Sequence, residues 1–370
     1  SADNEERRWM DSLIEKTATY MSQGGKFDMS LQVTIPNEWE NLAPINVGYT
    51  AGIETNMVAP VWIEKGNVMN KIILVSNHAK NVYEATTYEA RNDQTGEYIK
   101  DYRCTTPMEV VNYPVRDIKP SDLGIDFDTD FNFLAVAQWG PRKNIENTVK
   151  WFVEEFIDQN VGLVLKTFTA NNSVVDRYHT RQSVDRILSE YTDRKCKIYL
   201  LHGDMKDDEL AALYVHPKIK AFVSLAHGEG FGLPIFEAAY SGLPVVAPAW
   251  SGQCDYLFAT VKEKKKKVTK GLFGKVEFSI APIADNVVWE NVLIKDSMWC
   301  YPEQGSYKMR LRDVYKNYDK YLSMAKKLKN SIVSNFKKED KYKQFADAVY
   351  EEENFEVGEW IENLNAQMHE

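Results

Sequence analysis

Short apolar runs alternate with polar and amphipathic segments along this chain of 370 residues. The runs have the length and β-branched content of strands, and the segments between them have the spacing of helices or the composition of loops. Nine runs fit strands: 29–35, 45–50, 71–76, 109–115, 131–138, 162–168, 196–202, 220–226 and 243–248. Continuous apolar strands that alternate with helices predict an α/β fold whose parallel sheets are covered on both faces.

Amphipathic helices are predicted at three places. Segment 4–21 has apolar residues spaced among charges, and segment 306–350 has the pattern of long or paired helices. In the third, four apolar side chains recur on one helical face. These are Ile145, Val149, Phe152 and Phe156.

The length exceeds what one ordinary core accommodates, which predicts two domains. The polar, turn-rich and acidic segment 116–130 marks the boundary between them. The predicted organisation is an N-terminal domain over 1–120, a C-terminal domain over 121–335, and a C-terminal helix with an acidic tail over 336–370.

Composition excludes several classes of protein. A hydrophobic fraction of 44% is ample for a globular core. No window approaches the roughly 18 consecutive apolar residues of a membrane span, and the start of the chain is too charged for a signal peptide, so we expect a cytoplasmic protein. The four cysteines form no CxxC pair, which indicates neither a zinc site nor a disulfide framework. The formal net charge of −9 argues against nucleic-acid binding through the global field.

Residues 262–275 are a local exception, with seven lysines and one glutamate. One interpretation is a solvated, mobile loop. The other is an electrostatic contact with a polyanion, such as nucleic acid or an anionic membrane surface. The lysines that would make this contact are Lys264, Lys265, Lys266 and Lys267.

The stretch HGEGFGLPIFEAAYSGLP, residues 227–244, carries the most specific chemistry. It follows a predicted strand, which places it at the carboxyl edge of the sheet, where open α/β sheets bind ligands. Gly230 and Gly232 permit close approach of the backbone to a ligand, and Pro234 suits the first turn of a helix. The free amides of that turn form an anion site suited to a phosphate.

Two carboxylates flank this anion site. Glu229 and Glu237 would repel a phosphate, whereas ionised carboxylates are strong acceptors for the O–H groups of a sugar. The combination predicts a ligand that holds both groups, a phosphorylated sugar or a nucleotide sugar.

The segment EGFGLPIFEAAYSGLPVVAP resembles the donor-site motif, written E-x7-E, of GT-B fold glycosyltransferases of the large retaining family four. The segment VAQWGPRKN, 136–144, is similar to the family's stretch in which a lysine contacts the donor diphosphate, and Lys143 matches that lysine. The family's usual arginine falls on Gln138 here, and Arg142 is the substitute in this chain. The resemblance covers roughly residues 45–260 and implies two Rossmann-like domains that face a cleft. The glycine-rich loop that often follows the first strand is missing.

The resemblance also implies roles for individual donor-side residues. Glu237 would accept hydrogen bonds from the ribose hydroxyls. Glu229, with the amides of the loop, would hold the transferred sugar and its phosphate, while Arg142 and Lys143 would stabilise the departing diphosphate without a metal. The further donor-side residues are Gly230, Phe231, Gly232, Leu233, His202 and Gly203, the last two beside the nucleotide base, and His227.

Residues on the acceptor side are less well specified. Tyr49 and Glu54 lie at or just beyond the end of a strand predicted to face the cleft, and His78 is a third candidate. Each of these side chains has the alternative of an ordinary packing or surface role.

The predicted function is transfer of a sugar from a UDP-, GDP- or ADP-sugar to an acceptor hydroxyl, with retention of configuration, by a metal-independent hexosyltransferase without a cofactor. The acceptor is a glycan, a lipid-linked or other small molecule or, through the lysine segment, a hydroxymethylated pyrimidine in DNA. A non-catalytic sugar-nucleotide-binding protein is the alternative of another class. The sequence DFDTD at 126–130 suggests a metal-bound diphosphate site, but its place before a strand favours an acidic turn.

Overall fold

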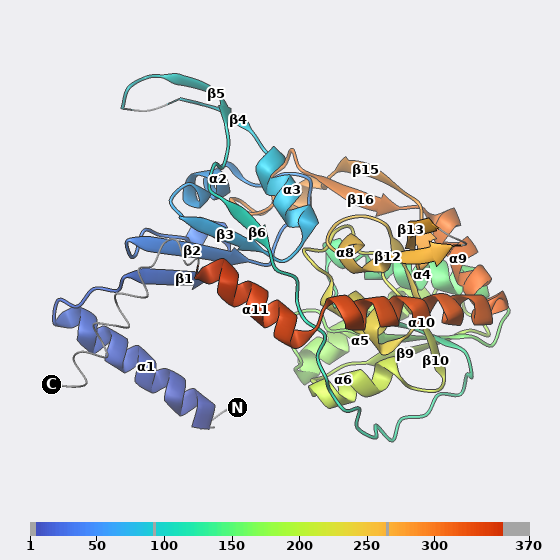
Figure 1. Cartoon of the computed structure of the whole chain (residues 1–370). Helices are drawn as coiled ribbons and strands as arrows, with labels where there is room; N and C mark the ends of the chain where they lie inside the picture. The colour runs from blue at the N-terminus through green and yellow to red at the C-terminus, as the bar shows by residue number, and fades with distance from the viewer. Residues whose placement is uncertain (1–4, 92–93, 264–265, 351–370) are drawn as a thin grey trace.

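The computed structural model describes residues 5–91, 94–263 and 266–350 (Figure 1). The helices are α1 (Glu5–Ser22), α2 (Pro60–Gly66), α3 (Asn77–Ala85), α4 (Ile145–Phe156), α5 (Val174–Leu188), α6 (Asp207–Tyr214), α7 (Leu233–Ser241), α8 (Cys254–Leu257), α9 (Gln304–Lys316), α10 (Tyr318–Asn335) and α11 (Lys338–Val349), with short 3-10 turns at Pro36–Glu38, Pro141–Lys143 and Asp285–Val287. The strands are β1 (Met29–Val33), β2 (Ile45–Thr50), β3 (Lys71–Leu74), β4 (Tyr88–Arg91), β5 (Tyr98–Tyr102), β6 (Met108–Val110), β7 (Asn132–Val136), β8 (Gly162–Lys166), β9 (Lys197–Leu201), β10 (Ile219–Val223), β11 (Val245–Pro248), β12 (Phe258–Glu263), β13 (Lys266–Gly271), β14 (Gly274–Val276), β15 (Phe278–Pro282) and β16 (Met298–Pro302).

The first sheet is parallel throughout, in the order β1-β2-β3-β6. Side chains alternate between the two faces of a strand, and β3 shows which elements cover each face. Ile72 and Leu74 pack in the cluster that contains Trp62 of α2 and Tyr83 of α3. Ile73, from the other face, packs against α11. Both faces are therefore buried, as an all-parallel sheet requires.

Helix α11 connects the far end of the chain to this first sheet. Its Ala348 and Val349 are buried with Val47, Ile73 and Val111. Figure 1 shows α10 lying along the second half of the molecule and α11 continuing from it towards β1 and β2.

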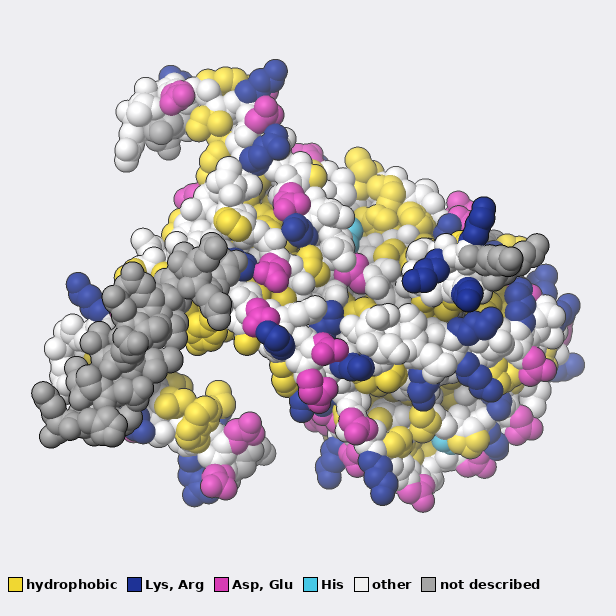
Figure 2. Space-filling model, viewed as in Figure 1, with side chains coloured by type: hydrophobic (Ala, Val, Ile, Leu, Met, Phe, Trp, Pro, Cys, Tyr) yellow, Lys and Arg dark blue, Asp and Glu magenta, His cyan; other side chains and the backbone are white. Residues whose placement is uncertain are grey.

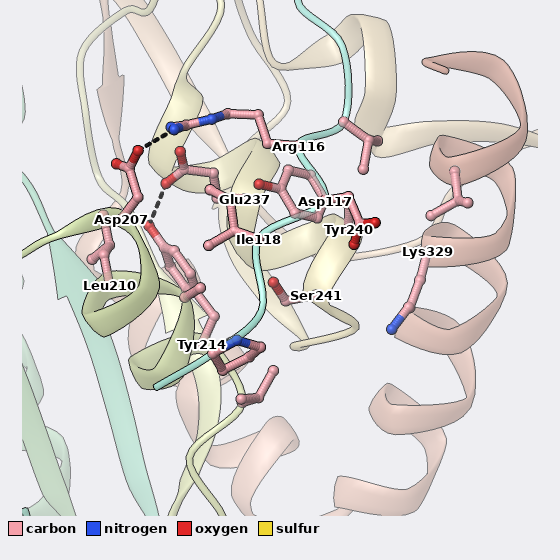
Figure 3. Close-up of a pocket in the computed structure, with 15 residues that line it drawn as sticks. Arg116, Asp117, Ile118, Asp207, Leu210, Tyr214, Glu237, Tyr240, Ser241 and Lys329 are labelled. Atoms are coloured by element: carbon pink, nitrogen blue, oxygen red, sulfur yellow. Dashed lines mark hydrogen bonds and ion pairs between the residues drawn. The ribbon is translucent and has the colours of Figure 1, made fainter. Parts of the chain in front are cut away.

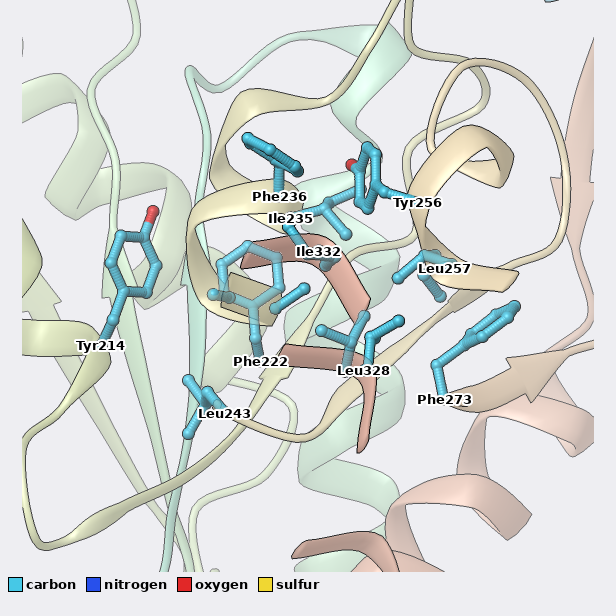
Figure 4. Packing of buried hydrophobic residues seen from close by; sticks show 14 of the residues in the cluster. Tyr214, Phe222, Ile235, Phe236, Leu243, Tyr256, Leu257, Phe273, Leu328 and Ile332 are labelled. Atoms are coloured by element: carbon cyan, nitrogen blue, oxygen red, sulfur yellow. The ribbon is translucent and has the colours of Figure 1, made fainter. Parts of the chain in front are cut away.

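The second sheet is also parallel, in the order β14-β11-β10-β7-β8-β9. One face carries Leu134, which is buried in a cluster with residues of α6, α7 and α10 (Figure 4). The other face carries Phe133, which packs against Phe152 and Phe156 of α4. The apolar stripe predicted for α4 is thus the stripe that covers the sheet. The carboxyl ends of β7 and β10 lead directly into the loops that build the candidate site.

The α/β fold with parallel sheets is confirmed, and each of the nine predicted strands is present, several of them shorter than predicted. Helices form in all three predicted places. The sequence pattern missed three antiparallel hairpins, β4–β5, β12–β13 and β15–β16. In β4–β5 and β12–β13 polar side chains interrupt the apolar alternation, so strand pairing leaves little signal in a single sequence. β15 and β16 are mostly apolar, but each ends at a proline, which argues against a strand.

The interpretation of the lysine segment as a loop is wrong for its described part. β12 pairs with β13, so that Thr260 lies opposite Thr269 and Val261 lies opposite Val268. These β-branched cross-strand pairs favour a hairpin even though two lysines, Lys262 and Lys267, also lie directly opposite each other. Lys264 and Lys265 lie outside the described residues.

The acidic segment that was predicted as the boundary runs between the two sheets without regular structure. Lys218 forms ion pairs with Asp126 at 2.7 Å and with Asp130 at 3.7 Å. Phe127, which lies between the two aspartates in the sequence, is buried. The buried Phe127 ring, which packs in one cluster with Ile219 and Phe222 of β10, therefore holds this segment against the second sheet, and the exposed ion pairs add little.

We expect Ala348→Asp to lower the free energy of unfolding by at least about 3 kcal/mol, because it places an unpaired carboxylate against the apolar face of the first sheet. The matched control is Ala346→Asp, which adds the same charge on the exposed side of α11 and should change stability by about 0.5 kcal/mol or less. Urea unfolding followed by near-ultraviolet circular dichroism measures both. Equal effects of the two variants would contradict the packing of α11 described here.

Candidate functional site

A cluster of four charged side chains lies where the loops after β7 and β10 meet. The Glu229 carboxylate accepts a hydrogen bond from Arg142 Nη1 at 3.0 Å and a second from Lys143 Nζ. Arg142 Nη2 also lies 3.5 Å from Glu54 Oε1. Only 7% of Glu229 is exposed, so water screens its two ion pairs weakly, although Arg142 and Lys143 themselves are only partly buried. Two cations and two carboxylates thus form one cluster of contacting charged side chains.

Backbone contacts fix the two loops against each other. The 3-10 turn at Pro141–Lys143 presents Arg142 and Lys143 just before α4, and Asn144 ends that turn in the left-handed region with φ of 53°. The amide of His227 donates to the Arg142 carbonyl at 2.8 Å. Arg142 Nη1 donates to the carbonyl of Gly228 at 2.8 Å. The cations therefore cannot move without disturbing the loop that carries Glu229.

Burial and ion pairing act in opposite directions on the charged groups of this cluster. Burial alone would raise the pKa of Glu229, but the charges of Lys143 and Arg142 outweigh it and lower that pKa. Burial would likewise lower the pKa of Arg142, and Glu229 and Glu54 outweigh it in turn. Both changes favour the ionised forms of Glu229 and Arg142.

A second loop, after β11, supports the Glu229 loop from behind. The Ser251 hydroxyl accepts a hydrogen bond from the Glu229 amide at 2.9 Å, and the amide of Gly252 donates to the Glu229 carbonyl at 2.9 Å. The Tyr256 hydroxyl donates to the carbonyls of Phe231 and Gly232, at 3.0 and 2.8 Å. The Glu229 loop is thus held by hydrogen bonds along its length.

The glycines of this loop permit close contact with the first half of the molecule. A Cβ added to Gly228 would lie 1.9 Å from the carbonyl oxygen of Glu54, and one added to Gly230 would lie 2.0 Å from that of Ala51. Real Cβ atoms do not approach a carbonyl so closely, so only glycine fits at either position. The loop after β2 and the loop after β10 therefore meet backbone to backbone, and Glu54 reaches Arg142 across that contact.

Helix α7 begins at the end of the same loop. Gly232 precedes it in the left-handed region, with φ of 83°, and Pro234 lies in its first turn. The amides of the first turn have no partner within the helix and carry the positive end of the helix dipole. The loop therefore runs into a helix start as the sequence predicted, and an anion at these amides stays a prediction.

Glu237 does not join the Glu229 cluster. Its carboxylate accepts a hydrogen bond from the Tyr214 hydroxyl at 3.0 Å, and it lines a cavity of about 400 Å³ together with Arg116, Asp207 and Tyr240. Figure 3 shows Arg116 reaching across this cavity to Asp207, with Glu237 between that ion pair and Tyr214. Burial raises the pKa of Glu237, although the Tyr214 hydrogen bond and the charge of Arg116 oppose the change.

His202 and Gly203 line a separate cavity of about 300 Å³ at the end of β9. His202 Nε2 lies 2.8 Å from Asp176 Oδ2, and Lys166 Nζ donates to the Gly203 carbonyl at 2.6 Å. Burial alone would raise the pKa of Asp176, but the hydrogen bonds from His202 and from the amides of Ala170 and Thr169 lower it. His202 therefore has a structural partner, while the backbone of this turn faces the cavity.

The remaining predicted residues lie in different surroundings. His227 Nδ1 is 2.7 Å from the carbonyl oxygen of Cys300, and its ring stacks on Trp299. His78 Nε2 is 3.1 Å from the Thr55 carbonyl oxygen, and burial lowers its pKa to about 4. Tyr49 lines a third cavity, beside Phe345. Both histidines are thus fixed by backbone carbonyls rather than by the Glu229 cluster.

The described lysines of β12 and β13 lie on the outer surface. Lys262, Lys266, Lys267 and Lys270 are exposed, and Figure 2 shows Lys and Arg side chains gathered around this hairpin and the neighbouring α10. None of these four lysines lines a cavity that contains Glu237, His202 or Tyr49.

Sequence reasoning missed several residues that the structure places at these cavities. Arg116 and Tyr214 flank Glu237, Lys341 lines the cavity that contains Tyr49, and Ser251 holds the Glu229 amide. Ser251 follows a predicted strand at the same sheet edge as Glu229, which is a usable signal. Arg116 and Lys341 lie in a linker and on a surface-like helix, and their sequence carries no comparable mark.

No known protein family matches the sequence, and no curated protein matches it. Solved structures do match the fold. Sucrose-phosphate synthase from Thermosynechococcus elongatus is 13% identical, with 95% of this chain and 77% of that chain covered and a TM-score of 0.58. Anabaena HepE, in complex with UDP and glucose, is 12% identical, with 82% and 71% covered and a TM-score of 0.53. An E. coli trehalose-6-phosphate protein bound with UDP-2-fluoro glucose is 10% identical, with 87% and 73% covered and a TM-score of 0.52.

These neighbours are GT-B glycosyltransferases, and the fold of this protein is GT-B, two Rossmann-like domains with parallel sheets. The chain spans about half the length of two other matched proteins, 50% of S. aureus TarM and 52% of the pneumococcal O-GlcNAc transferase GtfA. DNA as the acceptor finds no support among the neighbours. Within the described part of the chain, no helix is both long enough and apolar enough to cross a bilayer.

The Glu229 cluster predicts a pH-dependent contribution to stability. The lowered pKa of Glu229 means that its stabilisation is fully present above the unfolded glutamate pKa of about 4.3, and is lost as pH falls through the lower folded value. We expect Glu229→Gln to lower the free energy of unfolding at pH 7 by about 3 kcal/mol, because the partly buried Arg142 and Lys143 lose a buried carboxylate partner.

Urea unfolding at pH 7 and at pH 3 measures this difference. Glu190→Gln is the matched control, because it removes an exposed partner of Lys150 and should cost at most about 1 kcal/mol at either pH. A Glu229→Gln penalty that stays equal at the two pH values would show that the carboxylate charge is not what stabilises the cluster.

Proposed function

We propose that this protein is a glycosyltransferase that moves a sugar from a nucleoside diphosphate sugar to an acceptor hydroxyl. The observation that carries the proposal is the placement of Glu229 between Arg142 and Lys143, beside the start of α7. Cations and helix amides suit a diphosphate, and a carboxylate among them suits the hydroxyls of the attached sugar. The GT-B fold agrees with this use of the site.

We place the donor along the edge formed by the loops after β7, β9 and β10. Its base would lie by the backbone of His202 and Gly203, and its ribose hydroxyls would bind Glu237. The diphosphate would lie at Arg142, Lys143 and the amides of Phe231, Gly232 and Leu233. The transferred sugar would bind Glu229, with His227 behind the loop.

In the reaction, the bond between the anomeric carbon and the diphosphate oxygen breaks, and the acceptor oxygen bonds to the same carbon on the same face. Because the new bond forms on the face from which the diphosphate leaves, the anomeric configuration is retained. The acceptor proton passes to the leaving phosphate oxygen, which balances charge. Negative charge develops on the diphosphate, and Arg142, Lys143 and the α7 amides stabilise it without a metal. These residue roles and the retaining mechanism follow the resemblance to glycosyltransferase family four.

Glu54 gives the first half of the molecule a role in this site. It is ion-paired to Arg142 across the backbone contact between the two halves. An incoming diphosphate offers Arg142 a stronger partner, because a bidentate guanidinium–phosphate pair would replace a single contact of 3.5 Å with Glu54. Donor binding would thus exchange Glu54 for phosphate, and closure around the donor would exclude water, the competing acceptor.

The first experiment is a panel of UDP, GDP and ADP, each alone and as its sugar conjugate, scored by thermal shift and calorimetry. We expect one nucleoside diphosphate to raise the melting temperature and its sugar conjugate to be hydrolysed slowly or transferred. If a nucleotide sugar bound but was neither hydrolysed nor transferred to any acceptor tested, a non-catalytic nucleotide-sugar-binding protein would be favoured. Failure of every nucleotide to bind would refute the proposed function.

Arg142→Gln and Lys143→Gln should each weaken binding of the preferred nucleoside diphosphate. Loss of a charge-assisted hydrogen bond costs about 1.5–3 kcal/mol, or about 10- to 150-fold in Kd. Lys150→Gln removes a lysine of the adjoining α4 that pairs with Glu190 rather than with the cluster, and it should leave Kd within about twofold. Calorimetric Kd values for the three variants test this, and equal weakening by all three would point to a general field effect.

Glu237→Gln should weaken binding of the ribonucleotide by about 10- to 150-fold. It should have much less effect on the Kd of the 2′,3′-dideoxy counterpart, which lacks the hydroxyls that would donate hydrogen bonds to Glu237. Because burial raises the Glu237 pKa, neutralising this residue should not lower the melting temperature. An equal loss of affinity for both nucleotides would show that Glu237 acts on the cavity and not on the ribose.

A further inference from the structure

A cavity of about 470 Å³ lies at the carboxyl edge of the first sheet and is separate from the Glu229 cluster. Val33 ends β1, Tyr49 lies near the end of β2, and Asn112 and Tyr113 follow β6, so the floor of the cavity is the edge at which parallel sheets bind ligands. The proposed function assigns nothing to most of this space.

The opposite walls come from the second half of the chain. Leu233, the first residue of α7, and Glu237, one turn further on, line the cavity. Leu233 directly follows Gly232, where an added Cβ would lie 3.5 Å from the Glu229 Cβ. The cavity therefore opens beside the place where the sugar of the donor is proposed to lie, which is where an acceptor has to be held.

Aromatic rings and a buried cation define the chemistry of the cavity. Tyr113, Tyr342 and Phe345 line it, and the rings of Tyr49 and Phe345 meet edge to face at 5.5 Å. Flat rings of this kind pack against the apolar faces of sugars and of other ring compounds.

Lys341 is the unusual member of this cavity, because only 9% of it is exposed. Its ammonium group lies 3.1 Å from Gln344 Oε1 and 3.4 Å from Asn112 Oδ1, both neutral amide oxygens. Among the side chains that the structure describes, no carboxylate forms an ion pair with it, and Asp255 instead accepts hydrogen bonds from Asn77 and Asn112. A buried cation without an ion-pair partner is costly unless a ligand provides one. The charge of Asp255 and the Phe336 ring, whose centroid lies 5.0 Å from Lys341 Nζ, compensate this cost only in part.

We propose that this cavity is the acceptor site and that the acceptor is a sugar or similar ring compound carrying an anionic group, phosphate or carboxylate, which Lys341 binds. The proposal rests on the proposed function, since it requires a donor at the neighbouring Glu229 site. The ring would lie against the tyrosines, with its reactive hydroxyl directed towards Leu233 and the start of α7. The anionic group would take the position that no carboxylate of the described chain fills.

The test uses the full protein saturated with its preferred nucleoside diphosphate, so that donor binding is measured first and separately. Calorimetry then compares matched ligands: glucose with glucose 6-phosphate and with glucuronate, and mannose with mannose 6-phosphate. We expect at least one anionic member to bind about tenfold or more tightly than its neutral counterpart. The phosphate and carboxylate arms identify which anion Lys341 takes.

Lys341→Met should abolish that preference while leaving the nucleotide Kd within about twofold, and Lys341→Arg, which keeps the charge, should retain most of it. Lys343→Met is the matched control, because Lys343 lies on the same helix, is exposed and pairs with Asp347. Lys343→Met should change neither affinity.

Three results would overturn the proposal while leaving the proposed function intact. The first is equal binding of the neutral and anionic ligands. The second is a loss of nucleotide affinity in Lys341→Met as large as its loss of affinity for the anionic ligand. The third is an equal effect of Lys341→Met and Lys343→Met on the affinity for the anionic ligand. The second result would assign the cavity to the donor. Absence of nucleotide binding, in contrast, would refute the proposed function before the acceptor is tested.

Discussion

The contact between Glu229 and its two cations constrains the rest of the candidate site. A carboxylate that is almost fully buried is tolerated because Arg142 and Lys143 neutralise it, and the same pairing fixes the turn before α4 to the loop before α7. Arg142 extends this constraint to Glu54, in the other half of the molecule. One arginine thus links two sheets through two carboxylates, and any anionic ligand of the site has to compete with those carboxylates for it.

Close backbone approach provides the other half of the constraint. The glycines at 228 and 230 let the loop after β10 touch the loop after β2, and a methyl group at either position would separate them. The ion pair between Arg142 and Glu229 and the glycine contacts with the loop after β2 both involve the same few residues of the loop after β10. Together they make the geometry around Glu229 a property of both halves and not of the second sheet alone.

The sequence predicted the two parallel sheets and the region of the site because these features leave local marks. Buried strands are continuous apolar runs, and a glycine-rich loop with Pro234 identifies a helix start. The clustering of Arg142, Lys143 and Glu229 followed from placing two loops at one sheet edge. The position of Glu237 beside Tyr214 and Arg116, away from that cluster, depends on how α6, α7 and the linker pack, which no local pattern encodes.

The lysine segment and Lys341 show where local sequence patterns fail to predict the structure. Runs of lysine are typical of solvated loops, yet cross-strand pairs such as Val261 with Val268 form a hairpin. Lys341 has the neighbours of a surface lysine in sequence, and only the return of α11 to the first sheet buries it. Burial that arises from chain segments more than two hundred residues apart is a property of tertiary packing.

The path of α11 has a consequence for biosynthesis. Residues Val47, Ile73 and Val111 leave the ribosome early, but the side chains that cover them, Ala348 and Val349, are made some 240 to 300 residues later. During that interval one face of the first sheet has no native cover, and one face of the second sheet likewise waits for Leu328 and Ile332 of α10. The half of the protein that is translated first therefore cannot complete its folding until α11 has been made, and until then the nascent chain exposes an apolar surface.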